Sequence, residues 1–110
     1  MTAVALEPID ELFAALAEPT RRHLLDRLSA HGTATATLLA GESPVSRQAV
    51  VQHLAVLERV ALVTSTRSGR ERQYIVRPEP LTEAARWMDR IAAQWDARLV
   101  SIKRLAEAAE

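Results

Sequence analysis

The 110-residue sequence contains no cysteine, only three glycines and only four aromatic residues. Without cysteine the protein has no disulfide, no thiolate metal site and no thiol redox switch. So few glycines, with five prolines, exclude a collagen-like repeat. No apolar run approaches the ~20 residues that span a bilayer, and the first residues lack the pattern of a secretory signal. We therefore expect a cytoplasmic protein without a membrane partner.

Apolar residues make up 48% of the chain and charged residues 25%, as in an ordinary soluble domain. The length fits one domain over residues 1–110. A chain this short buries a small core and is only marginally stable alone, so a second copy would add stability.

Basic and acidic side chains balance over the whole chain but not along it. Residues 1–45 carry three basic and six acidic side chains, residues 46–77 carry six and two, and residues 78–110 carry five and six. The middle segment therefore has a net charge of +4 in a neutral protein. Phosphate binding requires a local basic segment of this kind.

Apolar residues at helical spacing predict four helices in the first 60 residues. Pro19 suits the first turn of the second helix, where its missing N–H costs nothing. Ser46 is a candidate N-cap of the fourth helix. The buried stripe of that helix is expected to be Val50, Leu54 and Leu57, at i, i+4 and i+7. The four helices are expected at residues 9–17, 19–31, 33–40 and 46–60.

Two short strand-like runs, 62–66 and 73–77, follow the fourth helix. Between them, residues 67–72 are polar and contain a glycine, so we expect a hairpin tip there. Pro78 and Pro80 then break the chain before the last helix.

This order of elements predicts the fold class: mainly α with a small β-hairpin, a winged helix-turn-helix. The helix-turn-helix is expected at about 33–60 and the wing at about 62–77.

The last helix, over about 81–108, carries an apolar stripe whose steps alternate between three and four residues. A stripe lasting about six turns exceeds what one small domain covers, and is typical of a helix that packs against a second copy. We expect a homodimer formed by this helix and the first, over about 8–17. Trp87 and Trp95 suit interface anchors, with a small-molecule cage as the alternative. The expected interface residues are Leu12, Phe13, Trp87, Met88, Ile91, Trp95, Leu99 and Ile102.

Three stretches of the chain resemble the ArsR/SmtB transcriptional regulators. Residues 17–22, AEPTRR, are similar to that family's helix opening. Residues 45–58, VSRQAVVQHLAVLE, resemble its recognition-helix signature, and Leu62-Val63 with residues 69–74, GRERQY, resemble its strand and wing. The resemblance spans about residues 10–105. It implies a DNA-binding regulator, and most simply a dimeric repressor that binds an inverted-repeat operator in its own promoter.

The metal sites of that family are missing from this chain. Its metal sensors carry a cysteine pair on the third helix, where residues 35–40 read TATLLA. Other members bind zinc through Asp and His on the last helix, which here has Asp89 and Asp96 but no histidine. The resemblance is therefore to the metal-independent branch, and we expect no metal and no cofactor. His23, His31 and His53 lack the spacing of a shared site. An unidentified small-molecule inducer stays open.

If the fourth helix enters a major groove, its exposed side chains reach base edges. Arg47 suits guanine, glutamine suits adenine, and Val51 suits a thymine methyl group. His53 lies beside the apolar stripe and suits either packing or a phosphate contact. Hairpin arginines suit DNA phosphates, with a soluble strand edge as the alternative. The expected DNA-binding residues are Ser46, Arg47, Gln48, Val51, Gln52, His53, Arg67, Arg70 and Arg72.

No serine, histidine and acid are arranged as a nucleophile with its base, and no glycine-rich phosphate loop is present, so we expect no enzyme. The alternative function is a winged-helix protein-interaction module that docks partners through its long last helix. The neutral net charge favours this alternative. Replacement of Arg47 and Arg70 distinguishes the DNA-binding regulator from the protein-interaction module, because only DNA binding depends on these two arginines.

Overall fold

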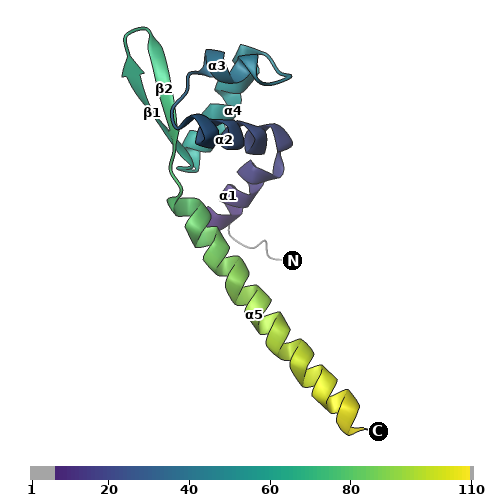
Figure 1. Ribbon diagram of the computed structural model, residues 1–110. Helices are drawn as coiled ribbons and strands as arrows, with labels where there is room; N and C mark the ends of the chain where they lie inside the picture. The colour runs from purple at the N-terminus through teal and green to yellow at the C-terminus, as the bar shows by residue number, and fades with distance from the viewer. Residues whose placement is uncertain (1–6, 110) are drawn as a thin grey trace, which may run out of the picture. The chain divides into compact units, whose positions relative to one another are not determined.

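The computed structural model describes residues 7–109, which form five helices and one hairpin in the expected order (Figure 1). The winged helix-turn-helix prediction is confirmed. The chain divides into two compact units, residues 1–80 and residues 81–110. The first unit contains α1 (Pro8–Ala17), α2 (Pro19–His31), α3 (Ala36–Gly41), α4 (Arg47–Arg59), β1 (Val63–Ser68) and β2 (Glu71–Val76).

A short polar motif joins α1 to α2. Glu18 N-caps α2, and its carboxylate accepts the backbone N–H of Arg21 at 3.0 Å. The side chain of Arg21 turns back and donates from Nε to the carbonyl oxygen of Ala15 at 2.6 Å, while Arg22 donates to that of Leu16. Carbonyls in the last turn of a helix have no partner within the helix. The two arginines therefore satisfy the C-terminal end of α1 and fix its angle to α2.

The core of the first unit is built from one face each of α1, α2, α3 and α4 and from buried residues of the wing. The stripe expected on α4 is confirmed, because Val50, Leu54 and Leu57 are all 0% exposed. Burying a leucine or valine side chain fully contributes about 1.5–3 kcal/mol relative to leaving it in water. The fully buried side chains are Leu24, Leu28, Leu39, Val50, Leu54, Leu57 and Leu62.

The third helix is shorter than expected. The prediction of 33–40 is wrong at its start, because α3 begins at Ala36 with Thr35 as its N-cap, whose hydroxyl accepts the N–H of Leu38 at 3.1 Å. Ala34 instead pairs with Tyr74 of the wing, and the two residues exchange N–H···O bonds of 3.2 and 2.8 Å. This bridge ties the entry of the helix-turn-helix to β2.

The wing lies where it is expected, but its two strands are longer than expected and its loop is shorter. Residues 67–72 do not form a wide tip, since Arg67 pairs with Arg72 and Ser68 with Glu71 in an antiparallel register that begins at Val63 and Val76. The loop is only Gly69-Arg70. Gly69 has a φ of +66°, and a left-handed glycine at the first position of a two-residue loop is the pattern of a type II′ turn.

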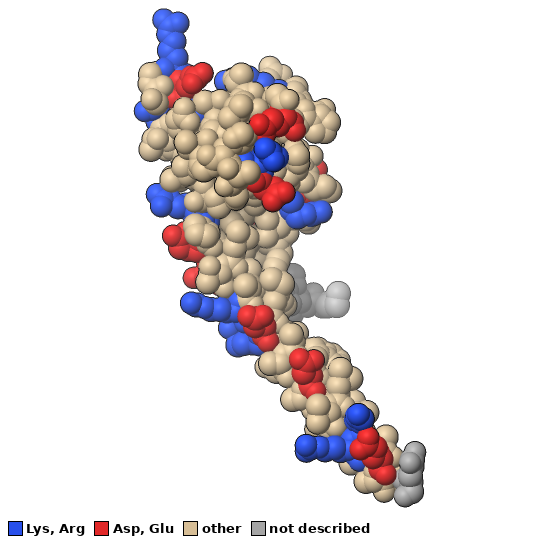
Figure 2. Space-filling model, in the orientation of Figure 1, with Lys and Arg blue, Asp and Glu red and all other residues tan. Residues whose placement is uncertain are grey.

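α5 spans Glu79–Ala108, two residues earlier than expected. Pro80 lies in its first turn, where a proline is tolerated, so only Pro78 precedes the helix. At 30 residues, α5 is about 45 Å long. Charged side chains of both signs alternate along the side of α5 seen in Figure 2. Its large apolar side chains are mostly exposed: Trp87 by 40%, Trp95 by 54% and Leu99 by 57%. No described helix has the length and apolar character to cross a membrane.

The α4 stripe predicts where the fold is most sensitive to substitution. Leu54→Ala should lower the free energy of unfolding by about 2–5 kcal/mol, because it leaves a cavity in a packed core. Gln52→Ala on the exposed face of the same helix should change it by less than about 0.5 kcal/mol. Urea titrations at equal protein concentration measure both. Equal effects of the two variants would contradict the orientation of α4.

Candidate nucleic-acid interface

α4 presents a continuous outer face. Its core-facing residues are fully buried, and the five positions between them are exposed: Arg47, Gln48, Val51, Gln52 and Ala55. The hydroxyl of Ser46 accepts the N–H of Ala49 at 3.1 Å, which confirms Ser46 as the N-cap. The exposed face and the positive end of the helix dipole therefore meet at the N-terminus of α4.

A hollow of about 340 Å³ lies between this face, α3 and the wing. Five of the nine sequence-predicted DNA-binding residues line it, namely Arg47, Val51, Arg67, Arg70 and Arg72. Ser46, Gln48 and Gln52 are exposed but lie outside its lining. The other lining residues were not among the predicted ones; they are Thr35, Ala36, Thr37, Glu71 and Tyr74.

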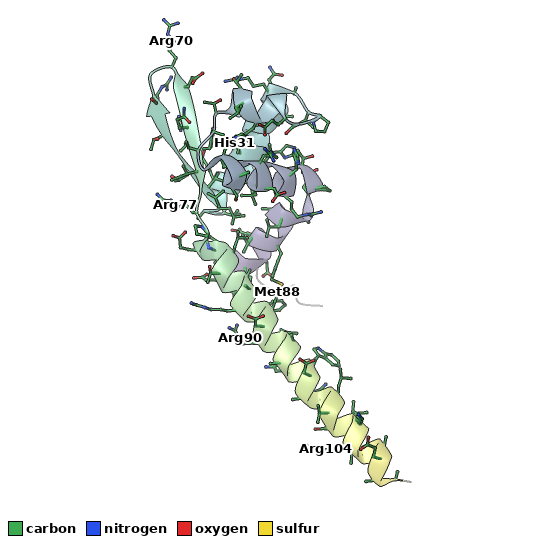
Figure 3. All side chains as sticks on the ribbon, viewed as in Figure 1. His31, Arg70, Arg77, Met88, Arg90 and Arg104 are labelled. Atoms are coloured by element: carbon green, nitrogen blue, oxygen red, sulfur yellow. The ribbon has the colours of Figure 1, made fainter. Side chains whose placement is uncertain are left out.

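The hollow is strongly basic, with four arginines and one carboxylate, Glu71, in its lining. Arg70 extends from the tip of the wing (Figure 3). Burial raises the pKa of Tyr74, which is 6% exposed, and the nearby Glu58 carboxylate raises it further. Tyr74 therefore stays neutral and adds no negative charge to the hollow.

Two of these arginines are held by hydroxyl groups. Arg47 donates from Nε to Thr37 Oγ1 at 3.1 Å. Arg72 donates from Nη1 to Ser65 Oγ at 3.0 Å, and that hydroxyl donates to Glu58 of α4 at 3.2 Å. These contacts orient the guanidinium groups before any ligand arrives. Each of the two guanidinium groups keeps most of its five N–H donors free for a partner.

His53 does not join this hollow. Its Nδ1 lies 3.3 Å from Nη1 of Arg21 and 3.9 Å from a carboxylate oxygen of Glu18, and its side chain is 22% exposed. A guanidinium group only donates, so Nδ1 accepts from Arg21. His53 therefore lies in a polar cluster between α4 and the start of α2.

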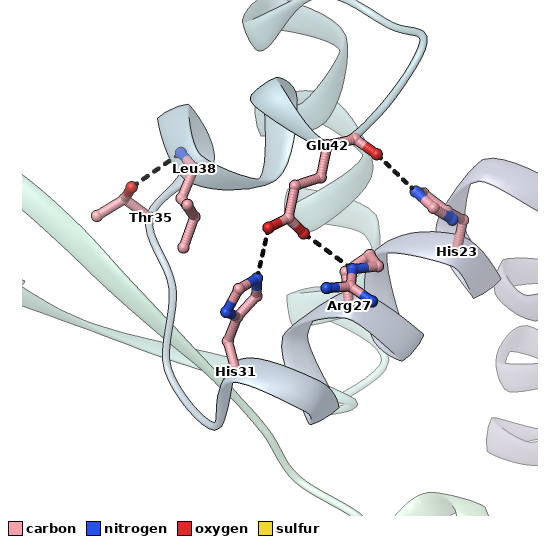
Figure 4. Close-up of polar contacts among 6 residues, drawn as sticks. All are labelled: His23, Arg27, His31, Thr35, Leu38 and Glu42. Carbon is pink, nitrogen blue, oxygen red and sulfur yellow. Dashed lines mark hydrogen bonds and ion pairs between the residues drawn. The ribbon is translucent and has the colours of Figure 1, made fainter.

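The turn between α3 and α4 is held by Glu42 (Figure 4). Its carboxylate accepts from Arg27 Nε at 2.8 Å and from His31 Nε2 at 2.7 Å, while its backbone oxygen lies 3.1 Å from His23 Nε2. The hydrogen bonds from Arg27 and then from His31 lower the pKa of Glu42 below its ordinary value of 4.5. Three side chains of α2 thus fix the turn that sets the angle between α3 and α4.

Within residues 7–109, no group of three or more His, Cys, Asp or Glu side chains is arranged to hold an ion. His23 and His31 both reach Glu42, but His53 lies in a different cluster.

The residues expected at a dimer interface fall into three groups by exposure. Leu12 is 4% exposed and belongs to the core of the single chain. Phe13 and Ile91 are half-buried. The others lie exposed on α5, as Trp87, Met88, Trp95, Leu99 and Ile102.

No protein-family profile matches the chain. The HTH-type transcriptional regulator Rv2034 of Mycobacterium tuberculosis is 38% identical over 98 residues, which make up 89% of this chain and 88% of that protein. The transcriptional repressor SdpR of Bacillus subtilis is 29% identical over 80 residues, or 73% of this chain and 88% of that protein. Among solved structures, an ArsR-like transcriptional regulator from Rhodococcus sp. RHA1 is 40% identical with a TM-score of 0.78, over 90% of this chain and 92% of that one.

The lowered pKa of Glu42 predicts a pH-dependent contribution to stability. A carboxylate whose folded pKa is depressed stabilises the fold above its ordinary pKa, and this contribution is lost as the pH falls through the folded value. Glu42→Gln should therefore lower the midpoint of thermal unfolding at pH 6, and the difference from the unmodified protein should shrink toward pH 3.5. Glu83→Gln, an exposed control on α5, should show no such trend. A deficit that is the same at both pH values would contradict the role given to Glu42.

Proposed function

Because the chain belongs to the ArsR family of transcriptional regulators, we propose that it binds double-stranded DNA. In this complex α4 lies in the major groove and the wing lies along the sugar–phosphate backbone of the DNA. The observation that carries this proposal is the basic hollow, in which the outer face of α4 and three wing arginines converge. This function has no catalytic step and requires no metal or cofactor. It places the protein in the cytoplasm with its DNA.

The outer face of α4 supports base readout. The bond from Arg47 Nε to Thr37 leaves both terminal nitrogens of the guanidinium group free to donate to O6 and N7 of a guanine. Gln48 and Gln52 suit adenine, and Val51, which is 37% exposed, suits a thymine methyl group. The free N–H groups at the Ser46 end of α4 suit a phosphate.

The wing supports DNA binding that does not depend on the base sequence. Arg67, Arg70 and Arg72 are exposed cations on a two-stranded arm, and cations of this kind contact phosphates, which fix position but carry no sequence information. Each phosphate contact releases counterions, so affinity falls with salt.

The exposed stripe of α5 supports a homodimer. Tryptophan, methionine and leucine side chains that are 40% to 57% exposed on one helix are costly in water and are strong interface anchors. A two-fold dimer would set two α4 helices in successive major grooves about 34 Å apart, on an inverted repeat. Bound at its own promoter, such a dimer acts as an autoregulatory repressor; the name of the related transcriptional repressor SdpR supports repression.

Two arginine variants should separate the recognition of bases from the binding of phosphates. In anisotropy titrations with a duplex from the protein's own upstream region, Arg47→Ala should lose about 1–3 kcal/mol of discrimination against scrambled DNA. Arg70→Ala should weaken binding to both duplexes alike and reduce the slope of log K against log salt by about 1 for each arginine removed.

The matched control is Arg104→Ala, an exposed arginine on α5 far along the chain from the wing (Figure 3). It should bind both duplexes as the unmodified protein does. If Arg47→Ala and Arg70→Ala also bind unchanged, the proposed interface is wrong.

One substitution in the stripe should dissociate the dimer. Leu99→Asp places a charge where the partner helix would pack, which is strongly unfavourable without a counter-ion. In light scattering after size exclusion, the mass should fall from about twice the 12.1 kDa of one chain to that of one chain. Arg104→Asp, about 140° around the helix from Leu99, should stay dimeric. A monomeric unmodified protein at the same concentration would contradict the dimer.

A further inference from the structure

A second hollow, of about 230 Å³, lies between α1, α2 and α4. It shares no lining residue with the basic hollow beside the wing, so the proposed DNA contact does not account for it. We call it the α1–α4 cleft. Its lining residues are Glu11, Ala14, Ala15, Arg21, Val56, Arg59 and Val60.

The lining combines an apolar wall with charged groups. Four small apolar residues, two on α1 and two at the C-terminal end of α4, face two arginines and one glutamate. Within residues 7–109, the side chains of Arg59 and Glu11 form no hydrogen bond or ion pair. With Arg21 and Arg59 against Glu11, the cleft has one positive charge in excess. A single negative charge on a ligand would balance it.

One of the two arginines is already held in place. Arg21 donates to the carbonyl oxygens of Ala15 at 2.6 Å and Ala14 at 3.4 Å, and to His53 at 3.3 Å. These contacts use three of the five N–H donors of its guanidinium group. The remaining donors are oriented in advance, which reduces the entropy lost when an anion binds.

We propose that the α1–α4 cleft binds a small organic monoanion, a carboxylate attached to a short apolar body. The carboxylate pairs with Arg59 and the free donors of Arg21, and the apolar body packs against Ala14, Val56 and Val60. Charge-assisted hydrogen bonds of this kind are about twice as strong as neutral ones. The cleft is smaller than the ~300–1,000 Å³ of sites for drug-sized ligands, so the apolar body is compact.

The position of the cleft gives the ligand a route to the DNA-binding face. Val56, Arg59 and Val60 belong to α4 or its C-terminal cap, and Arg21 reaches α4 again through His53. A ligand that pairs with both Arg21 and Arg59 joins the start of α2 to the end of α4, and it therefore changes how α4 is held against α1 and α2. By linkage, ligand and DNA then alter each other's affinity by the same factor. This last step rests on the proposed function, whereas ligand binding itself does not.

Benzoate is a suitable probe of the proposed class, and benzamide is its neutral counterpart of the same shape. In NMR titrations at constant ionic strength, benzoate should produce saturable shifts in the methyl resonances of Ala14, Val56 and Val60. Benzamide should bind at least about tenfold more weakly, since it lacks the charge. Arg59→Gln should weaken benzoate by about tenfold or more, whereas Arg77→Gln, an exposed arginine outside the cleft, should leave it unchanged.

Several outcomes would overturn the proposal. Equal binding of benzoate and benzamide would show an apolar cleft without anion selectivity. Shifts that are spread over the surface, or are unaffected by Arg59→Gln, would show an adventitious additive only. Shifts of the same methyl groups on dilution of the protein, without benzoate, would show that a second copy occupies the cleft.

The coupling to DNA has a separate readout. Saturating benzoate should change the affinity of the unmodified protein for its upstream duplex, and Arg59→Gln should abolish that change while retaining DNA binding. If the unmodified protein binds benzoate but not DNA, the proposed function fails and the site stands. If benzoate binds and DNA affinity does not respond, the coupling is wrong.

Discussion

The packing of α4 into the core is the constraint on which the other features depend. Val50, Leu54 and Leu57 are 0% exposed, and together they fix the rotation of the helix about its own axis. Each such burial contributes about 1.5–3 kcal/mol, more than the ~1 kcal/mol net of a typical hydrogen bond. The apolar stripe therefore decides which side of α4 faces outward. Arg47 and Val51 lie on that side for the same reason that Leu54 lies inside, and the basic hollow follows from it.

Polar contacts hold the ends of the helices and the wing in the positions that the apolar core sets. Glu42 receives hydrogen bonds from α2 and holds the turn before α4, while the Ala34–Tyr74 bridge holds the wing against the start of the helix-turn-helix. Arg21 satisfies the end of α1 and also reaches His53 on α4. These contacts lie at the ends of elements, where backbone groups need partners. They position the arginines of the hollow without adding much to the burial energy.

Periodicity and local signals predicted most of the fold and much of the candidate site. The α4 stripe, its outer face and the Ser46 cap all follow from residues within four positions of each other. The shorter α3 could not be predicted in this way, because Ala34 pairs with a residue 40 positions away. The predicted wing strands are shorter than the observed ones, because polar, exposed residues such as Arg67 and Arg72 are typical of loops. Contacts between distant elements, such as Glu42 with α2 and the α1–α4 cleft, leave no pattern in the sequence.

The most direct test of the account is to map the surface that DNA occupies. Amide resonances of the isotope-labelled protein can be followed as a duplex from its upstream region is added. The account predicts perturbations concentrated at residues 46–52 and 67–72, on the outer face of α4 and on the wing, with α5 little affected beyond its first turns. Perturbations confined to α5, or no perturbation when the duplex is in excess, would contradict it and would favour a protein-interaction module.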